Sequence, residues 1–446
     1  MVNASAAPPA TPSFGEALRY WLRLGFISFG GPAGQIAIMH QDLVERRRWI
    51  SEGRFLHALN YCMLLPGPEA QQLATYIGWL LHRTPGGIAA GVLFLLPSLL
   101  LLTALSWLYV RFGHVPLVAA VFAGLKPAVT AIVLQAAQRI GARALKNAWL
   151  VGLAALSFVA IAVLHLPFPW LVFGAALMGA AGGHWWPALF EASAAHAARS
   201  VDHGPAVIDD DTPRPAHARF RWPRLALVVA VGLGLWALPM WALETTQGAD
   251  GTLTRMGWFF TKAALLTFGG AYAVLPYVYQ GAVGHYGWLS AHQMIDGLAL
   301  GETTPGPLIM VVAFVAFVGG HGAGLAGEGT PLAMALAAAL LVAWFTFLPS
   351  FLFILAGGPL VESTRGAVRL TAPLTAITAA VVGVVLSLGV FFAEHTFWPR
   401  GLDQGLDAFA VLLAAAALLA LVRYRVGMLR VLLACALLGA ARGLLS

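Results

Sequence analysis

Phe29-Gly30-Gly31 interrupts an apolar stretch near the start of the chain, and the same tripeptide returns as Phe268-Gly269-Gly270. A second break, Pro66-Gly67-Pro68, returns as Pro305-Gly306-Pro307. Both pairs are separated by the same 239 residues. This constant spacing predicts two homologous halves. In a membrane protein, duplicated halves with broken helices point to a transport site where the halves meet.

The composition is that of a polytopic membrane protein. Hydrophobic residues make up 59% of the chain and charged residues only 10%. Apolar stretches long enough to cross a bilayer recur along the whole length, and no stretch of similar length is polar enough for a soluble domain. Clear examples are 88–110, 116–135, 148–166, 225–243 and 332–355. We therefore predict an all-α protein embedded in the lipid bilayer.

The polar residues divide the chain into segments. Residues 1–13 form an N-terminal tail without the cationic region of a cleaved signal. The first repeat is expected over 14–188 and the second over 254–446. Between them, 189–224 reads as a polar cytoplasmic linker and 225–243 as a linking transmembrane helix.

The charged and sulfur-bearing residues exclude several classes of function. The net charge of +7 comes without a basic, aromatic-rich soluble patch, so it indicates cytoplasmic loops rather than a nucleic-acid partner. Cys62 and Cys435 lie in apolar segments and read as buried small hydrophobes. The linker carries acids and histidines at irregular spacing, which favours a solvated loop over a metal site; these are Asp209, Asp210, Asp211, His196, His203 and His217. We predict no metal site and no cofactor.

The arms on either side of each Pro-Gly-Pro break are too short to span a bilayer alone. Each arm has roughly 11–13 residues, which cover about 16–20 Å of a core about 30 Å thick. Two readings follow: about 13 full spans, or about nine full spans plus four re-entrant hairpins. The positive-inside rule favours hairpins, because they place Arg46, Arg47, Arg48 and Arg54 on the cytoplasmic side.

Both readings place the halves in opposite orientations, because each gives an odd number of crossings between equivalent points. The expected fold is therefore a pair of inverted-topology repeats.

The breaks themselves predict an anion site. A helix that restarts after a Pro-Gly break directs unpaired N–H groups and the positive end of its dipole into the site. Such ends bind anions, and four of them near the membrane midplane suit a small oxyanion. A simpler alternative is that Gly and Pro only permit close helix packing. The predicted break residues are Phe29, Gly30, Gly31, Pro32, Pro66, Gly67, Pro68, Phe268, Gly269, Gly270, Pro305, Gly306 and Pro307.

Polar residues near the breaks extend this candidate site. Arg23 and Lys262 occupy equivalent positions, and Lys126 lies in another apolar span. A cation within the membrane is a functional candidate, although a long side chain also reaches the interface by snorkelling. The neutral candidates for hydrogen bonds to the substrate are Ser28, Gln71, Gln72, Thr303 and Thr304.

Two acids adjoin the Pro-Gly-Pro breaks. Glu69 directly follows the first break and Glu302 precedes the second. Both are candidates for a proton coupled to transport. For Glu69, the alternative is that an acid in the first turn of a helix complements the helix dipole.

The chain resembles the chromate ion transporter (CHR) family. The resemblance rests on an ordered set of motifs across both halves: 24–32 (LGFISFGGP), 44–50 (VERRRWI), 65–78 (LPGPEAQQLATYIG), 267–270 (TFGG), 287–289 (GWL), 304–307 (TPGP) and 347–351 (FLPSF). The chain is similar to the long two-domain members, not to the single-domain members that pair as separate chains. In the second half Ala271 replaces the proline of the first Gly-Gly-Pro, so one anion-facing turn is expected to differ.

The resemblance implies a carrier of the bacterial inner membrane that exports chromate, a tetrahedral dianion similar to sulfate. We expect a secondary transporter that works by alternating access, driven by a gradient because no Walker-type loop is present. An anion channel and a sulfate carrier remain alternatives, and the sequence leaves open whether the chain forms a homodimer. An enzyme acting on lipid phosphates lacks a supporting motif.

Overall fold

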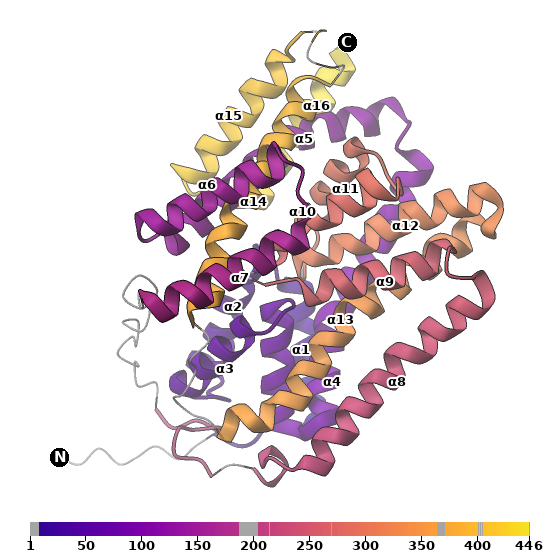
Figure 1. Ribbon diagram of the computed structural model, residues 1–446. Helices are drawn as coiled ribbons and strands as arrows, with labels where there is room; N and C mark the ends of the chain where they lie inside the picture. The colour runs from indigo at the N-terminus through magenta and orange to yellow at the C-terminus, as the bar shows by residue number, and fades with distance from the viewer. Residues whose placement is uncertain are drawn as a thin grey trace.

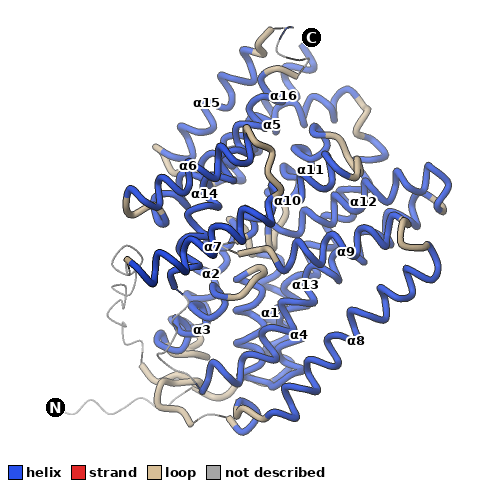
Figure 2. The backbone as a smooth tube through the Cα atoms, in the orientation of Figure 1, coloured by secondary structure: helices blue, strands red, loops and turns tan. Residues whose placement is uncertain are grey.

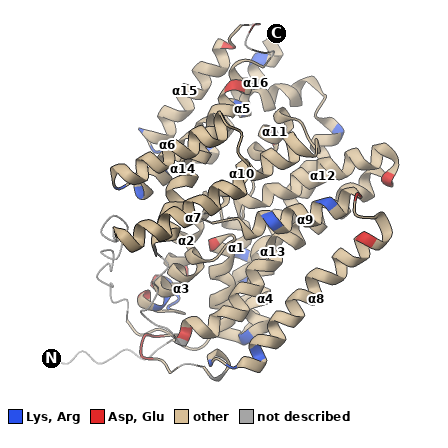
Figure 3. Ribbon diagram, in the orientation of Figure 1, with Lys and Arg blue, Asp and Glu red and all other residues tan. Residues whose placement is uncertain are grey.

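The protein folds into α-helices joined by short loops. The computed structural model describes residues 9–186, 204–213, 215–268, 270–363, 371–399, 401, 403 and 405–445. No strand occurs in these ranges (Figures 1 and 2). Charged residues are sparse and most lie near helix ends or in loops (Figure 3).

Seven helical segments of the described chain are long and apolar enough to cross a membrane: Glu69–Phe112, Pro116–Ala144, Trp222–Gln247, Leu308–Glu328, Pro331–Glu362, Ala372–Phe397 and Met428–Leu445. The prediction of an all-α polytopic membrane protein is confirmed.

The helices fall into two series joined by a linking helix. The first series is α1 (Phe14–Ile27), α2 (Gly31–His40), α3 (Glu52–Leu64), α4 (Glu69–Phe112), α5 (Pro116–Ala144), α6 (Ala148–Ala162) and α7 (Phe168–Trp185). The linking helix is α8 (Trp222–Gln247). The second series is α9 (Thr252–Leu265), α10 (Ala271–Tyr279), α11 (Ala291–Thr303), α12 (Val311–Ala323), α13 (Pro331–Ser363), α14 (Thr371–Phe397), α15 (Ala408–Val422) and α16 (Met428–Leu445).

Equivalent helices of the two series have matching lengths. α3 and α11 each contain 13 residues and begin at residues 52 and 291, which repeats the spacing of the sequence motifs. α6 and α15 each contain 15 residues, and α7 and α16 each contain 18. These later pairs start at 148 and 408 and at 168 and 428, so their spacing is 260. The repeat therefore continues past the last shared motif, with extra residues inserted in the second series.

The first Pro-Gly-Pro break forms the tip of a hairpin between α3 and the first part of α4. α4 itself turns back at His82 and Arg83, where its backbone leaves the helical conformation, so it consists of a short arm before this turn and a long arm after it. The arms are antiparallel and in close contact, since a Cβ atom on Gly78 would lie 2.5 Å from the carbonyl oxygen of Gly86. The short arm also packs beside α3, where the rings of Tyr61 and Tyr76 are 6.0 Å apart. α3 and the short arm of α4 therefore enter and leave on one side.

The second Pro-Gly-Pro break repeats this arrangement between α11 and α12. A Cβ atom on Gly297 of α11 would collide with the ring of Phe314 of α12, and one on Gly301 would lie 3.4 Å from Val311. Residues farther from the break in α11 thus meet residues farther from the break in α12, as in an antiparallel hairpin. These contacts support the reading with hairpins over the fully spanning one.

The Phe-Gly-Gly breaks also return the chain to its starting level. After α1 and α2, Arg47 lies 3.2 Å from Glu16, and the ring of Trp49 packs 5.2 Å from that of Tyr20. In the second series, Trp288 stacks on Phe260 of α9 at 6.0 Å. Each Phe-Gly-Gly break therefore joins two antiparallel arms.

α8 carries the chain from one end of the bundle to the other. It starts beside the linker at the bottom of the view and ends at the right-hand edge, where α9 begins (Figure 1). Only 11% of its most apolar 18-residue stretch is buried, which suits a helix on the lipid-facing perimeter. The hairpins of the first series lie toward the linker and those of the second series toward the opposite face, as expected for inverted repeats.

The described part of the linker docks on the start of α3. Ser51 N–H donates to the Ile208 carbonyl at 2.9 Å, and the N–H groups of Val207 and Ile208 donate to the carbonyls of residues 48 and 49 at 3.0 and 3.1 Å. The Ser51 hydroxyl donates to Asp210 at 2.9 Å. The linker was expected to be a solvated loop, and this part of it is instead hydrogen-bonded to the first repeat; His196 and His203 lie outside the described residues.

Candidate functional site

The helical segments that begin at the four breaks have no side-chain cap. The residues preceding them are Gly30 before α2, Pro68 before α4, Gly270 before α10, and Pro307 before the 3₁₀ turn Leu308–Met310 that leads into α12. By contrast, α1, α3 and α11 begin away from the breaks and are capped by Ser13, Ser51 and Ser290. Because uncapped first-turn N–H groups need a partner, the breaks offer donors suited to an anion.

The structure brings the breaks together in two pairs, each formed across the halves. The N–H of Gly67 donates to the carbonyl of Thr267 at 2.7 Å, and the N–H of Gly306 donates to the carbonyl of Ser28 at 2.8 Å. Gly67 is equivalent to Gly306 and Ser28 to Thr267, so the two hydrogen bonds are exchanged by the repeat. This reciprocity is the signature of a local two-fold relationship between the halves.

Both central glycines are required by their conformation and their neighbours. Gly67 has φ +128° and Gly306 has φ +102°, values that side chains disfavour. A Cβ atom on Gly67 would collide with the hydroxyl of Ser350, and one on Gly306 would lie 2.5 Å from the Cβ of Ser98. Each break thus packs on a serine that follows a proline in a long helix of the other half.

Three buried glutamines add polar groups to this junction. Gln35 in α2 donates through Nε2 to the carbonyl of Gly306 at 2.6 Å, and Gln72 donates to the carbonyl of Pro66 at 2.8 Å. Gln71 donates to the hydroxyl of Thr75 at 3.0 Å. The amide oxygens of all three, and the hydroxyl of Ser98, have no hydrogen-bond partner among the described residues. Buried polar atoms of this kind are retained where a ligand or water completes them.

The predicted residues in and beside the breaks differ in how deeply they are buried. Ser28 and Thr304 are buried, and their hydroxyls donate to carbonyls one turn earlier in their helices. Pro305, Gly306 and Pro307 are buried, as are Gly67, Pro68, Gly270 and Gln71; Phe29, Gly31, Pro32, Pro66 and Phe268 are half-buried and Gly30 is exposed. Gly269 lies outside the described residues. The second-half breaks are thus more enclosed than those of the first half.

The predicted cations are not gathered at the breaks. The side chains of Arg23 and Lys262 are both exposed, on α1 and α9. Lys126 lies 3.6 Å from the carboxylate of Asp296, near the middle of the short helix α11 and two turns from the break. Their role in holding an anion stays a prediction.

The two predicted acids differ in their surroundings. Glu302 is 4% exposed and its carboxylate accepts a 2.5 Å hydrogen bond from the hydroxyl of Tyr272 in α10. Glu69 is half-buried and occupies the first turn of α4, where it complements the helix dipole. The structure therefore favours Glu302 over Glu69 as an enclosed carboxyl group at a break.

Several residues at the junction were not predicted as site residues. Gln35 and Ser98 were not singled out, and Ser350 belonged to the 347–351 motif without a predicted role; the equivalent of Gln35 is Val274. The only available signal was a polar side chain within an apolar helix. Arg54 was read as a loop charge, but it lies inside α3 and is 4% exposed.

The described residues contain no group placed to bind a metal ion. No cluster of three or more His, Cys, Asp or Glu residues is placed to hold a metal ion. A cavity of about 650 Å³ lies elsewhere, between the turn in α4 and the linker, lined in part by Arg54, His82 and His217. This cavity lies on the linker side of the molecule.

Comparisons with known proteins agree with this architecture. The family described as "Chromate transporter" matches residues 15–180 and 254–440, one segment in each half. The chain is 32% identical over 417 residues to a chromate transport protein of Pseudomonas aeruginosa, covering 92% of this chain and 89% of that protein. It is 30% identical over 382 residues to a chromate transport protein of Cupriavidus metallidurans, covering 85% and 83%.

A probable chromate transport protein of Synechococcus elongatus is 27% identical over 384 residues, covering 86% of each chain. No solved structure is significantly similar to this chain. One assignment follows from the two matched segments, the repeated set of broken helices and the similarity to these relatives over most of the chain. The protein is a multi-pass membrane protein of the chromate transporter family.

Proposed function

We propose that this protein is a secondary transporter that exports chromate across the bacterial inner membrane by alternating access. The observation that carries the proposal is the reciprocal pairing of the breaks, which brings uncapped helix N-termini from both halves to one junction. A tetrahedral dianion matches such donors in charge and in the number of oxygens that accept hydrogen bonds.

Inverted repeats support alternating access as the mechanism. Two halves of opposite orientation exchange the same set of contacts when one rocks against the other, so the site faces each side in turn. The glycine-to-carbonyl hydrogen bonds between the halves lie at the centre of such a movement. Energy for export would come from an ion gradient.

Glu302 is the proposed coupling group. Its carboxyl group is enclosed beside Pro305-Gly306-Pro307 and bonded to Tyr272. A carboxyl group that gains and loses a proton at this position would change the charge next to the anion site. Proton binding from one side and release to the other would then be linked to the movement of chromate.

The experiment is chromate efflux from proteoliposomes loaded with labelled chromate. Wild type is compared with Glu302→Gln, Tyr272→Phe and Lys262→Ala, with and without a pH gradient and with sulfate as competitor. The proposal expects saturable efflux that a pH gradient drives in wild type and no longer drives in Glu302→Gln. Tyr272→Phe keeps the carboxyl group and is expected to retain part of this response.

The remaining outcomes identify the alternatives. Chromate flux that does not saturate with chromate concentration and does not depend on the pH gradient indicates an anion channel. Efflux of sulfate in preference to chromate indicates a carrier of a different oxyanion. Normal efflux in Lys262→Ala removes the exposed lysine from the anion site without affecting the rest of the proposal.

A further inference from the structure

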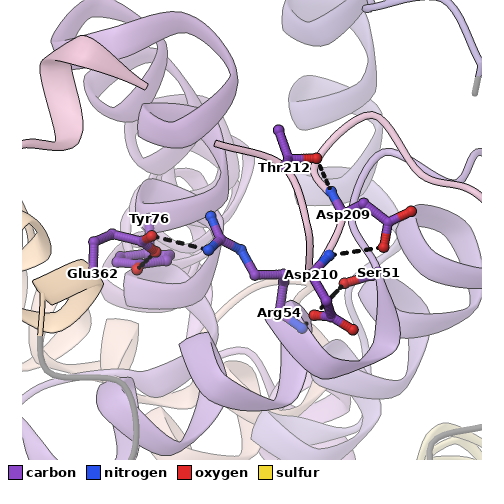
Figure 4. A network of polar contacts seen from close by, with 7 residues as sticks. All are labelled: Ser51, Arg54, Tyr76, Asp209, Asp210, Thr212 and Glu362. Carbon is purple, nitrogen blue, oxygen red and sulfur yellow. Dashed lines mark hydrogen bonds and ion pairs between the residues drawn. The ribbon is translucent and has the colours of Figure 1, made fainter. Parts of the chain in front are cut away.

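A buried ion pair joins the two halves near the linker. Arg54 on α3 and Glu362 near the end of α13 approach to 3.0 Å, and their side chains are 4% and 1% exposed. The hydroxyl of Tyr76, on the short arm of α4, donates to the same carboxylate at 2.5 Å (Figure 4). We call these three residues the linker-side lock.

A second polar cluster joins the halves at the opposite end. Asp296 on α11 has a side chain that is 7% exposed. Its carboxylate accepts a hydrogen bond of 2.9 Å from Tyr109, near the end of α4, and lies 3.6 Å from the ammonium of Lys126 on α5. We call these residues the far-side lock.

The two locks occupy equivalent places in the repeat. α3 and α11 are the equivalent short arms before the Pro-Gly-Pro breaks. The long arm of α4 and helix α13 are also equivalent, since Pro97-Ser98 in one matches Pro349-Ser350 in the other. In both locks, therefore, the short arm of one half is tied to the distal end of the long helix of the other half.

The locks lie on opposite faces of the bundle. Arg54 lines the cavity beside the linker, as do His82 and Arg83 at the turn of α4. Tyr109 follows that turn by 26 helical residues, a rise of about 39 Å. One lock therefore closes the linker face and the other closes the face across the membrane.

Stability alone does not account for these buried charges. Withdrawing an ion pair from water offsets most of the attraction between its members, so an apolar pair of the same size would hold the halves at least as well. Ionisable residues within membrane helices are expensive and mark function. A polar tie differs from an apolar one because it can be broken and hydrated when water enters.

We propose that the linker-side lock and the far-side lock open alternately during transport, each admitting water and substrate to the breaks from its own face. This inference rests on the proposed alternating access. Arg54 is one of the residues that line the cavity beside the linker, so separation of Arg54 from Glu362 would widen this cavity between α3 and α13. Separation of Tyr109 and Lys126 from Asp296 would open the other face in the same way.

The test is the labelling of a cysteine at the junction from each face. Ser350→Cys is introduced into the full chain with Cys62→Ser and Cys435→Ser, and a membrane-impermeant maleimide is added to right-side-out or inside-out vesicles. The linker-side lock is removed by Arg54→Gln with Glu362→Gln, and the far-side lock by Lys126→Gln with Asp296→Asn. Each double change leaves no buried charge without its partner.

Removal of one lock is expected to raise the rate of maleimide labelling about tenfold from one face only. This factor is within the usual range for coupled sites. The linker-side variant should label faster from the linker face and the far-side variant from the opposite face. Matched controls break an exposed ion pair on each face, Glu16→Gln and Asp250→Asn, and should leave both rates unchanged. Tyr76→Phe and Tyr109→Phe remove one hydroxyl from each lock and should give the same directions if the double variants fail to fold.

Two failures are distinguishable. If wild type transports chromate but the lock variants label equally from both faces, or no faster than the controls, the locks are purely structural and this inference is wrong. If labelling is specific to one face while wild type moves no chromate, the locks stand and the proposed substrate is wrong.

Discussion

Replacement of Gly67 by alanine tests the junction between the halves. Alanine at φ +128° is strained by about 1–3 kcal/mol, and the new methyl group collides with the hydroxyl of Ser350 and lies 2.7 Å from Nε2 of Gln72. Overpacking in a closed core adds about 1–3 kcal/mol. The expected destabilisation is therefore about 2–6 kcal/mol, shared between backbone strain and collision.

The two parts can be separated with a second change. Ser350→Ala removes the hydroxyl and leaves a Cβ atom at an ordinary contact distance of 3.5 Å from the new methyl group. The combination of Gly67→Ala with Ser350→Ala should recover part of the loss, because the backbone strain and the 2.7 Å approach to Nε2 of Gln72 remain. The equivalent glycine behaves differently, since a methyl group on Gly306 meets the Cβ of Ser98 at 2.5 Å. Gly306→Ala should be rescued by Ser98→Gly and not by Ser98→Ala.

The assay is the apparent melting temperature of purified protein in detergent, followed by tryptophan fluorescence, together with chromate efflux from proteoliposomes. The expected order of stability is wild type, then Gly67→Ala with Ser350→Ala, then Gly67→Ala alone. Two results would contradict this packing: a melting temperature of Gly67→Ala equal to that of wild type, or rescue of Gly306→Ala by Ser98→Ala as complete as that by Ser98→Gly. Either result would mean that the breaks are not packed as tightly as described.

Three further predictions concern the junction and the linker. Gln35→Ala removes the hydrogen bond to the Gly306 carbonyl and should cost about 1–3 kcal/mol, visible as a lower melting temperature, because that carbonyl stays buried. Ser51→Ala removes the cap of α3 and should cost about 0.5–2 kcal/mol while speeding hydrogen exchange at the Ile208 amide; unchanged exchange would contradict the docking of the linker. Burial, reinforced by the nearby charge of Arg224, lowers the pKa of His217, so protonation favours the undocked linker. Docking should be complete above about pH 6.5 and weaken as the pH falls below it, measured by the same exchange, and His217→Gln should abolish this pH dependence.

Much of the fold could be predicted from the sequence, because the repeated motifs contain glycine and proline residues that break helices. The shared spacing located α3 and α11 to within a few residues, and the apolar stretches located α5, α8 and α13. The second repeat was expected over 254–446, but the pairing of α6 with α15 was not predicted, since these helices share length but no glycine or proline motif. Helix length emerges from packing, and a single chain does not reveal it.

The candidate site was less predictable than the fold. The motif residues could be identified because glycine and proline have conformational consequences wherever they occur. Ser98, Ser350 and Glu362 become significant only through contact with the other half, and no spacing within one half encodes that contact. The exposure of Arg23 and Lys262 likewise depends on how their helices rotate against neighbours.

The reciprocal hydrogen bonds of Gly67 and Gly306 are made by main-chain atoms on both sides, and this has a consequence for how such proteins diverge. A contact between an amide and a carbonyl makes no demand on the side chain that accompanies the carbonyl, so Ser28 and Thr267 satisfy it equally. Duplicated genes can therefore drift apart in most of their coding sequence while their products still recognise each other through the backbone. The same recognition would serve two half-length subunits encoded separately, provided that they insert into the membrane with opposite orientation.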